Sequence, residues 1–422
     1  MTVVARQSKQ TRLTKHGHKR GVRVAAACRA ADAVSALSRR TGRGEGGVIG
    51  GRVILALAPG AIEALSTDRD VTLVSGTNGK TTTSAMLAAA LRTQGAVTTN
   101  ANGANTPAGL TAALAASDAS LAVLETDEGW LPRTVSETHP RTAVLLNLSR
   151  DQLHRHHEVK KLVRAWRDAT DALDVIVANA DDPDVVWPAM AAKKQVWVAC
   201  GQRWIQDAIV CPRCGGPCTR TGTAWGCECG LRRPTPDWWL EGDYLVSRTT
   251  RVRLSIPLPG LANLANAAMA VATAVHHGVD PKVAAEAVAT IDTVAGRYAV
   301  FEHEGREARL LLAKNPAGWL EALSMLRPDT PLALVFNSDG VDGRDPSWLY
   351  DVSFDSLQDR PVAVAGRRAT DMLVRLRMAE LDEAESYPTL RDALRALPAG
   401  PVDVLANYTA FQDARKELGG AH

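Results

Sequence analysis

The turn from Gly76 to Thr81, with the sequence Gly-Thr-Asn-Gly-Lys-Thr, carries residue types that bind phosphate. A glycine-rich loop between a strand and a helix presents backbone N–H groups to phosphate oxygens, and the helix N-terminus adds about half a positive charge. Lys80 would reach the β- and γ-phosphates, and Thr81 would place its hydroxyl on Mg²⁺. The turn therefore predicts a site for a nucleoside triphosphate and magnesium.

A second group of residues with suitable spacing is the cysteine cluster, because five of the seven cysteines lie between Cys211 and Cys229. Such clustering is typical of a metal site in a reducing compartment and not of the disulfide framework of a secreted protein. Cys211, Cys214, Cys227 and Cys229 would supply the four thiolates of a closed structural zinc site. The second pair is C-x-C, so Cys218 could replace one member, and free or redox thiols are the alternative.

The phosphate turn is expected to join a strand to a helix. A β-branched run at 71–74 precedes the turn, and an alanine-rich helix is expected from Thr82 to about Arg92. Further apolar runs alternate with helical stretches, at 121–124, 142–146 and 175–177. This order predicts a parallel-sheet α/β fold of the P-loop type. The alternation stops at about Trp204, where the cysteines and the pair Trp238-Trp239 indicate an insertion.

A second set of strand signals follows at 332–336, 362–365 and 402–405, and it predicts a smaller, Rossmann-like α/β domain. The six glycines between Gly42 and Gly51 predict a mobile loop. The expected divisions are a basic N-terminal tail with a first helix at 1–43, an ATP-binding domain at 44–295 with a zinc ribbon at about 205–235, and a C-terminal domain at 296–422.

The composition is that of an ordinary globular protein, with 45% hydrophobic and 23% charged residues among 422. The longest apolar runs are far shorter than the roughly 20 residues that span a bilayer. The net charge of +3 hides an asymmetry, because residues 1–43 hold eleven Lys or Arg and one acid, which leaves 38 basic and 45 acidic residues elsewhere. This basic segment is expected to be a solvated tail, with a tether to nucleic acid or lipid headgroups as the alternative.

The short phosphate turn and the threonines after it resemble the ATP loop of Mur ligases, which join amino acids to peptidoglycan precursors through an acyl phosphate. The resemblance implies a magnesium site at Thr81 and Glu125, and a carboxylate at a strand end is a suitable hard ligand. It also implies that ATP is bound by Gly76, Thr77, Asn78, Gly79, Lys80, Thr81, Thr82, Asn263, Asn266 and Arg297.

The cysteine ribbon narrows this resemblance to the MurT-type synthetase subunits of lipid II isoglutaminyl synthase. Four stretches are similar to that family, at 150–153 (Arg-Asp-Gln-Leu), 233–236 (Arg-Pro-Thr-Pro), 314–318 (Lys-Asn-Pro-Ala-Gly) and 407–410 (Asn-Tyr-Thr-Ala). The most informative stretch is 342–351, which resembles the family's Asp-Gly-x-Asp-x-Ser-Trp-x-x-Asp. In the family the final aspartate orients the histidine of a separate glutaminase, so the resemblance implies a catalytic role in trans for Asp351.

The resemblance implies a ligase that amidates the α-carboxyl of D-glutamate in the stem peptide of lipid II and produces D-isoglutamine. ATP would activate the carboxylate as an acyl phosphate, and ammonia from a glutamine amidotransferase partner would displace the phosphate. The chain shows no G-x-S-x-G or other nucleophile signature, so glutamine hydrolysis is expected in the partner of a heterodimer. The protein would be cytoplasmic and would meet lipid II at the inner membrane surface.

Two other functions remain open at this point. A stand-alone Mur or folylpolyglutamate-type ligase would add an amino acid without a glutaminase, but amino-acid-adding Mur ligases carry a carbamylated lysine where this chain has Arg167. A zinc-containing, ATP-dependent nucleic-acid binder would use the ribbon and the basic segment, and its affinity would depend steeply on salt. No nucleic-acid partner is expected on the first interpretation.

Overall fold

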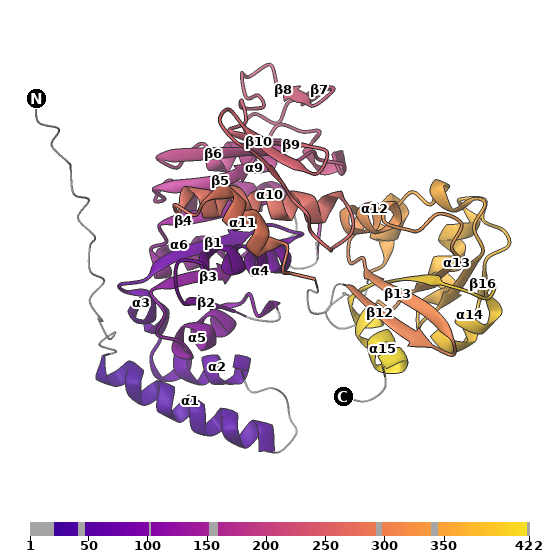
Figure 1. Ribbon diagram of the computed structural model, residues 1–422, viewed down its shortest axis with the longest axis horizontal. Helices are drawn as coiled ribbons and strands as arrows, with labels where there is room; N and C mark the ends of the chain where they lie inside the picture. Colours follow the sequence, from indigo (N-terminus) through magenta and orange to yellow (C-terminus); the bar gives the residue numbers. More distant parts are fainter. Residues whose placement is uncertain are drawn as a thin grey trace, which may run out of the picture.

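The computed structural model describes residues 21–40, 47–100, 103–151, 159–292, 298–338 and 345–419. Two α/β units lie beside each other, an N-terminal unit that is indigo to orange in Figure 1 and a smaller C-terminal unit that is orange to yellow. The divisions predicted at 43/44 and 295/296 stay predictions, because both fall in stretches outside the described residues.

The N-terminal unit is built on one large sheet. Its strands are β1 (Asp70–Ser75), β2 (Val97–Thr99), β3 (Leu121–Glu125), β4 (Thr142–Leu145), β5 (Val175–Asn179), β6 (Lys194–Ala199), β9 (Trp238–Glu241), β10 (Tyr244–Ser247) and β11 (Arg251–Arg253). Their order is β11-β10-β9-β6-β5-β4-β1-β3-β2, and the strands from β9 to β2 are parallel. The predicted apolar runs are buried strands of this sheet, as expected where helices cover both faces.

Helices pack on both faces of the large sheet. One hydrophobic core joins the sheet to α1 (Val22–Arg40), α2 (Gly47–Leu57), α3 (Ala61–Ser66), α5 (Pro107–Ala115), α6 (Leu131–Thr138), α8 (Val159–Thr170) and α9 (Pro183–Ala189). A second core joins the other face to α4 (Lys80–Leu91), α10 (Leu261–His276) and α11 (Pro281–Val288). The parallel α/β class predicted from the sequence is therefore confirmed.

The glycine-rich stretch contains one wrong prediction. A loop was expected over 42–51, but α2 begins at Gly47, while residues 41–46 lie outside the described part of the chain. A Cβ on Gly51 would lie 1.8 Å from the carbonyl oxygen of Ala108, and one on Gly50 would lie 2.8 Å from the hydroxyl of Ser35. These glycines let α2 pack closely between α1 and α5, so they serve close approach and not flexibility.

The insertion predicted at about 205–235 begins with a short 3₁₀ turn, η2 (Gln206–Ala208), and contains the antiparallel hairpin of β7 (Thr219–Thr221) and β8 (Ala224–Gly226). This hairpin lies outside the large sheet, at the top of Figure 1. Trp238, which was grouped with the insertion, instead opens β9 and pairs in parallel with Val198 of β6. The chain thus rejoins the sheet directly after the ribbon.

The C-terminal unit has a second sheet and its own helices. Its elements are β12 (Tyr298–His303), β13 (Arg306–Leu312), α12 (Pro316–Ser324), β14 (Leu332–Val335), η4 (Ser347–Asp351), η5 (Asp355–Leu357), β15 (Val362–Ala365), α13 (Ala369–Arg377), β16 (Glu385–Ser386), α14 (Leu390–Ala396), β17 (Val402–Ala406) and α15 (Tyr408–Gly419). The strand order is β12-β13-β17-β14-β15-β16, and β12 pairs antiparallel with β13. The predicted runs at 332–336, 362–365 and 402–405 are the central parallel strands.

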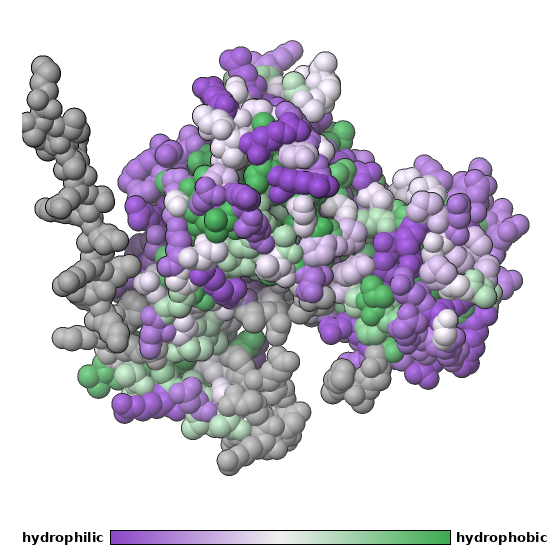
Figure 2. All heavy atoms as spheres, viewed as in Figure 1, coloured by the Kyte–Doolittle hydropathy of each residue, from purple (hydrophilic) through white to green (hydrophobic). Residues whose placement is uncertain are grey.

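Hydrophilic side chains cover most of the C-terminal unit on the face shown in Figure 2. Within the described stretches, none of the helices combines the length and the apolar character that a membrane span requires.

Candidate functional site

The predicted phosphate turn connects β1 to α4, which begins at Lys80, two residues earlier than expected. Gly76 and Gly79 have φ angles of +151° and +87°, which side-chain-bearing residues rarely adopt. A Cβ on Gly79 would also lie 2.3 Å from Oδ1 of Asn266 in α10. Both glycines are therefore required by the shape of the turn, and the second one is required by its close approach to α10.

Lys80 is buried and bends back across the turn. Its Nζ donates to the Gly76 carbonyl oxygen at 2.6 Å and forms an ion pair with Oε2 of Glu128 at 2.8 Å. Burial by itself would lower the pKa of Lys80, but the carboxylates of Glu128 and Glu125 outweigh it and raise this pKa above its usual value. Burial likewise opposes the ionisation of Glu128, yet Lys80 and Lys314 hold the pKa of Glu128 below its usual value. Lys80 is thus a buried cation, fully charged at neutral pH.

Glu125 lies at the end of β3 with 1% of its surface exposed. Oε1 accepts from the amide of Asn105 at 3.1 Å, and the backbone N–H donates to Asn100. Oε2 is buried and has no hydrogen-bond partner within the described part of the chain. A buried carboxylate oxygen is costly unless a cation or a water molecule meets it, and carboxylates are the ligands that Mg²⁺ prefers. The geometry of Glu125 therefore fits the magnesium role expected for it.

Three residues that the sequence interpretation missed hold the turn in place. Glu128 pairs with Lys80, and its carbonyl oxygen accepts from the indole of Trp166 at 2.8 Å. Asn147 clamps Asn78, because its Oδ1 accepts from the Asn78 N–H at 2.9 Å and its Nδ2 donates to the Asn78 carbonyl at 3.0 Å.

The third missed residue, Asn315, exchanges side-chain amide hydrogen bonds with Asn78 at 3.2 and 3.3 Å. This pair connects the turn to the C-terminal unit. The only sequence signal for Asn315 was its place in the stretch 314–318.

A cavity of about 220 Å³ lies beside the turn, between α10 and the C-terminal unit. The structure brings five of the predicted ATP-binding residues to its wall: Asn78, Gly79, Thr82, Asn263 and Asn266. Asn266 accepts from the hydroxyl of Thr83 at 3.2 Å, and Asn263 donates to the carbonyl of Pro259 at 2.6 Å. The C-terminal unit contributes Tyr298 and Lys314, among others. Arg297, the last predicted contact, lies outside the described residues.

The loop after β4 contacts both the turn and the C-terminal unit. Thr77 and Ser149 exchange two hydrogen bonds, because the Thr77 hydroxyl donates to the Ser149 carbonyl at 3.2 Å and accepts from its N–H at 3.0 Å. The side chains of the next two residues contact the C-terminal unit: Arg150 pairs with Asp351 at 2.8 Å, and Asp151 pairs with Lys314 at 2.5 Å. The predicted catalytic residue Asp351 therefore lies at the contact between the two units, at the end of η4.

The four predicted zinc ligands converge in the ribbon. The Sγ atoms of Cys211, Cys214, Cys227 and Cys229 all lie within 4.8 Å of one another, and Cys218 is not part of this group. The Cys211–Cys229 and Cys214–Cys227 sulfur distances are 3.7 and 3.5 Å. Tetrahedral zinc with bonds of about 2.3 Å places its sulfur ligands about 3.8 Å apart. The cluster is therefore compatible with zinc.

Arg167, which the resemblance placed where amino-acid-adding ligases have a lysine, packs between α8 and α9. Its Nη1 donates to the Trp187 carbonyl at 2.6 Å, and its guanidinium lies 5.6 Å from the Trp187 ring centre. These contacts connect α8, which carries Arg167, to α9, which carries Trp187.

Comparisons with known proteins agree with this geometry. Residues 312–411 match the family model "MurT ligase C-terminal", and residues 74–202 match "Mur ligase middle domain". The Lipid II isoglutaminyl synthase (glutamine-hydrolyzing) subunit MurT of Staphylococcus aureus (strain COL) is 29% identical over 74% of this chain and 78% of that protein. The subunit of the same name from Streptococcus pneumoniae (strain ATCC BAA-255 / R6) is 28% identical over 89% and 93%.

A likeness to a solved structure extends the agreement to the fold. The pseudomurein peptide ligase type C of Methanothermus fervidus is similar with a TM-score of 0.65 at 21% identity, covering 82% of this chain and 78% of that chain. At this identity the likeness shows the fold alone. The family-model matches and the MurT relatives, which extend over both units, support assignment of the chain as a MurT-type ligase of the Mur ligase superfamily.

Proposed function

We propose that this chain is the synthetase subunit of a lipid II isoglutaminyl synthase, which amidates the α-carboxyl of D-glutamate in the stem peptide with ammonia from a glutaminase partner. The observation that carries the proposal is the phosphate turn beside a cavity, with a buried cation at Lys80 and an unmatched carboxylate oxygen at Glu125. The chain that contains this site is similar to MurT subunits along both units. The reaction would take place at the cytoplasmic face of the membrane.

ATP, when bound with Mg²⁺, would supply the phosphoryl group that activates the substrate carboxylate as an acyl phosphate. The residues of this chain would bind and orient the reactants. Lys80 would turn from Glu128 toward the phosphates, and Glu128 keeps it protonated until then. Thr81 and Glu125 would hold the metal ion. Preorganised charges of this kind act strongly because they lie in a site from which water is largely excluded.

The remaining predicted ATP contacts would hold the nucleotide around these charges. The backbone of the turn would surround the phosphates, and Asn263 and Asn266 would contact the adenine from α10. The C-terminal unit lines the cavity from the opposite side, and its Lys314 and Asn315 bond to Asp151 and Asn78. Closure of the two units around the reactants would keep water away from a reactive acyl phosphate.

Asp351 would complete the active site of the partner glutaminase by orienting its catalytic histidine. Its side chain is 39% exposed, and the neighbouring Tyr350 is 54% exposed, so both are accessible to a second protein. A carboxylate on an imidazole N–H fixes the tautomer and stabilises the imidazolium. The zinc site would have a separate, structural role, because four cysteines fill a tetrahedral ion and leave no open position for chemistry.

Asp351→Asn tests the proposal in the complex with a candidate glutaminase. We expect glutamine-dependent amidation of lipid II to fall to a small residual rate and amidation by free ammonia to continue, each followed by the small mass decrease that accompanies exchange of a hydroxyl for an amino group. Asp355→Asn is the matched control, because Asp355 is an exposed carboxylate of the next 3₁₀ turn that meets Ser353.

Loss of both activities in Asp351→Asn would place Asp351 in the ATP site or in the fold. Retention of both would remove it from glutamine hydrolysis. If the wild-type complex transfers glutamate to the substrate instead of ammonia, the chain is an amino-acid ligase and the proposed reaction is wrong.

A further inference from the structure

Arg150 lies where three parts of the chain meet: the loop after β4, the start of the ribbon and the end of η4. Its Nε donates to Oδ1 of Asp207 at 2.7 Å, and its backbone N–H donates to Oδ2 of the same carboxylate at 2.9 Å. Its Nη1 donates to Oδ2 of Asp351 at 2.8 Å. One guanidinium therefore connects the ribbon segment to the residue proposed to serve the partner.

The Asp207 end of this arrangement is firmly fixed. The Asp207 side chain is only 6% exposed, and its Oδ2 also accepts from the indole of Trp204 at 2.6 Å. Arginine presents its donors in a rigid planar fork. Because Asp207 holds Nε, the guanidinium has lost most of its rotational freedom before it meets Asp351. Ordering the Asp351 side chain on this preformed donor costs less entropy than ordering both groups together.

The backbone of Arg150 is held from both sides as well. Ser149 is bonded to Thr77 of the phosphate turn, and Asp151 is paired with Lys314 of the C-terminal unit. Arg150 therefore projects from a fixed segment. Asp351, in contrast, ends a short 3₁₀ turn, and its side chain is 39% exposed. Of the two partners, Arg150 is the one that can fix the position of the other.

We propose that Arg150 is a positioning residue for glutamine hydrolysis: it binds Oδ2 of Asp351 and orients the carboxylate so that Oδ1 faces the imidazole of the partner glutaminase. This inference rests on the proposed role of Asp351. A carboxylate that orients a histidine must itself be held, because a small displacement of a catalytic group can cost about 100-fold in rate. Arg150 would act through Asp351 and would not contact either substrate.

A role in stability is a poor explanation for the same contact. Arg150 and Asp351 are 32% and 39% exposed, and ion pairs between groups this exposed contribute little to stability. A contact that contributes so little to stability does not require a buried anchor at Asp207 or a fixed backbone at Arg150. Both features instead fix the direction in which Arg150 holds Asp351.

The test is carried out on the complex of the full chain with its glutaminase. Arg150→Gln should lower glutamine-dependent amidation about 10- to 100-fold, while ammonia-dependent amidation and the dissociation constant of the complex stay unchanged. Arg150→Lys, which keeps the charge but not the fork, should restore part of the rate. Asp207→Asn, which weakens the anchor and leaves Arg150 in place, should produce a smaller loss of the same selective kind.

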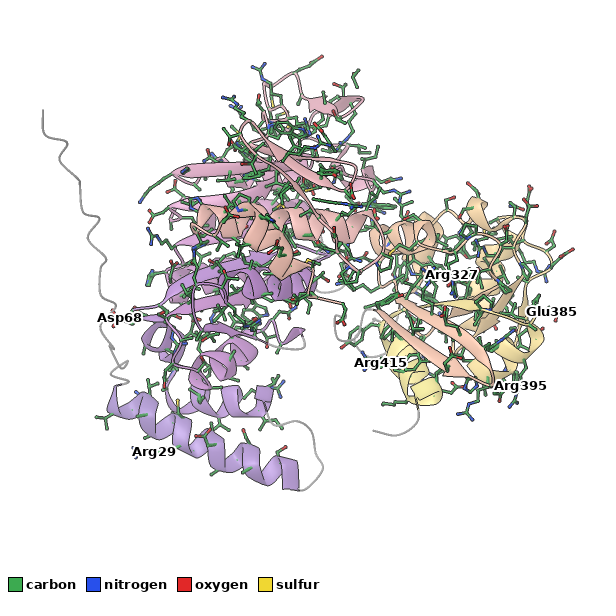
Figure 3. The ribbon with its side chains drawn as sticks, in the orientation of Figure 1. Arg29, Asp68, Arg327, Glu385, Arg395 and Arg415 are labelled. Carbon is green, nitrogen blue, oxygen red and sulfur yellow. The ribbon has the colours of Figure 1, made fainter. Side chains whose placement is uncertain are left out.

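A double variant separates action through Asp351 from a general defect. If Arg150 works only by orienting Asp351, Arg150→Gln combined with Asp351→Asn should be no slower than Asp351→Asn alone, since two mutations in one pathway are not additive. Arg395→Gln is the control, because Arg395 pairs with Glu304 at 2.6 Å at the far edge of the C-terminal unit and should affect neither rate (Figure 3).

Three outcomes would overturn the inference about Arg150: an unchanged or faster glutamine-dependent rate in Arg150→Gln, an equal loss of both activities, or additive losses in the double variant. If Asp351→Asn leaves glutamine-dependent amidation intact, the role of Asp351 itself is wrong and the inference fails with it. The Asp351→Asn result thus tells the failure of the proposed function apart from the failure of the inference.

Discussion

Each unit of the molecule buries a carboxylate in its sheet, and the two carboxylates have opposite surroundings. In the C-terminal unit, Asp403 of β17 is fully buried, and both of its oxygens accept from Arg309, at 2.9 and 2.8 Å. Arg327 adds its backbone N–H at 2.8 Å and its Nε at 3.0 Å. In the N-terminal unit, Glu125 of β3 is equally buried, yet one of its oxygens meets no partner within the described residues.

This difference separates a carboxylate that holds the fold from one that is ready for a ligand. An unmatched buried acceptor costs about 1–3 kcal/mol, and more when it is charged, so native structures keep few of them. Asp403 lies inside a central strand, with β13 and β14 on its two sides. Glu125 lies at the carboxyl edge of its sheet, next to the phosphate turn, where α/β proteins bind their ligands. For these two carboxylates, saturation by arginines matches a structural role, and an unmatched oxygen at the carboxyl edge of the sheet matches a ligand site.

The largest effect is expected at Lys80, the buried cation beside the unmatched carboxylate. Lys80→Ala removes the charge that would neutralise the phosphates, so ATP turnover should fall by at least about 1,000-fold. Zinc content, measured by metal analysis, should stay unchanged. Lys193→Ala is the control, because Lys193 is 72% exposed and pairs with Asp174. Turnover retained in Lys80→Ala would contradict the assignment of the turn.

At Asp403, the saturated carboxylate, we expect a loss of stability. Asp403→Ala leaves the guanidinium of Arg309, which is 9% exposed, without its partner, and breaking a buried pair in this way costs about 3–5 kcal/mol. Denaturant unfolding should show this loss. The exposed pair of Arg395 provides the comparison, because Arg395→Gln should leave the free energy of unfolding nearly unchanged. If the two variants unfold alike, saturation of a carboxylate does not report a structural role.

Glu125→Gln should uncouple activity from stability. If Glu125 holds the magnesium ion as proposed, ATP turnover should fall about 100-fold, with a rise in the Mg²⁺ concentration that it requires. The free energy of unfolding should change by less than about 1 kcal/mol, because the unmatched carboxylate oxygen disappears together with the attraction of Glu125 to Lys80. A loss of stability as large as that of Asp403→Ala would place Glu125 among the structural carboxylates.

The sequence predicted the parts of this comparison that have a local pattern. Apolar runs such as 121–124 and 332–336 became buried parallel strands, because strands covered on both faces are apolar at every position. The phosphate turn and the cysteine cluster could be predicted for a similar reason, since the residues proposed to bind in each are close in sequence. The prediction of a loop up to Gly51 was wrong, because a glycine there allows α2 to pack closely against α5. This tertiary contact has no local signal in the sequence.

The residues that sequence reasoning missed have distant partners. Glu128 meets Lys80 48 positions away, and Asp207 meets Arg150 57 positions away. A single acid in a loop has no periodicity or spacing that would distinguish it from a solvated one. The order of the strands, β6-β5-β4-β1-β3, places β3 beside β1 and β6 two strands away from β4, and so brings the ends of these loops together.

Asp182 and Asp184 have more partners than Glu125 and fewer than Asp403, and the dependence of stability on pH can test how well these partners compensate for burial. Both are buried at the start of α9. Asp182 accepts backbone N–H groups from Leu148 and Asp184, and Asp184 pairs with Lys160 at 2.6 and 2.9 Å. Burial nevertheless raises the pKa of Asp182 to about 6 and that of Asp184 to about 7. Their partners thus compensate for burial only in part.

The sign of the pH effect follows from these pKa values. The folded state holds a proton on Asp184 up to about pH 7, whereas the unfolded chain releases it near the usual pKa of 3.8, so this carboxyl destabilises the fold as the pH rises between those values. Between about pH 8 and pH 6, the unfolding free energy of the wild type should rise by about 1 kcal/mol relative to Asp184→Asn, as urea denaturation would measure. His276 and His277, whose pKa values burial lowers, act in the opposite direction but cancel in the difference. Asp182, whose charge also raises the pKa of Asp184, titrates together with it and is part of the difference. If the difference in unfolding free energy between the wild type and Asp184→Asn does not change with pH, Lys160 satisfies Asp184 as fully as the arginines satisfy Asp403. Asp184 would then be a structural carboxylate.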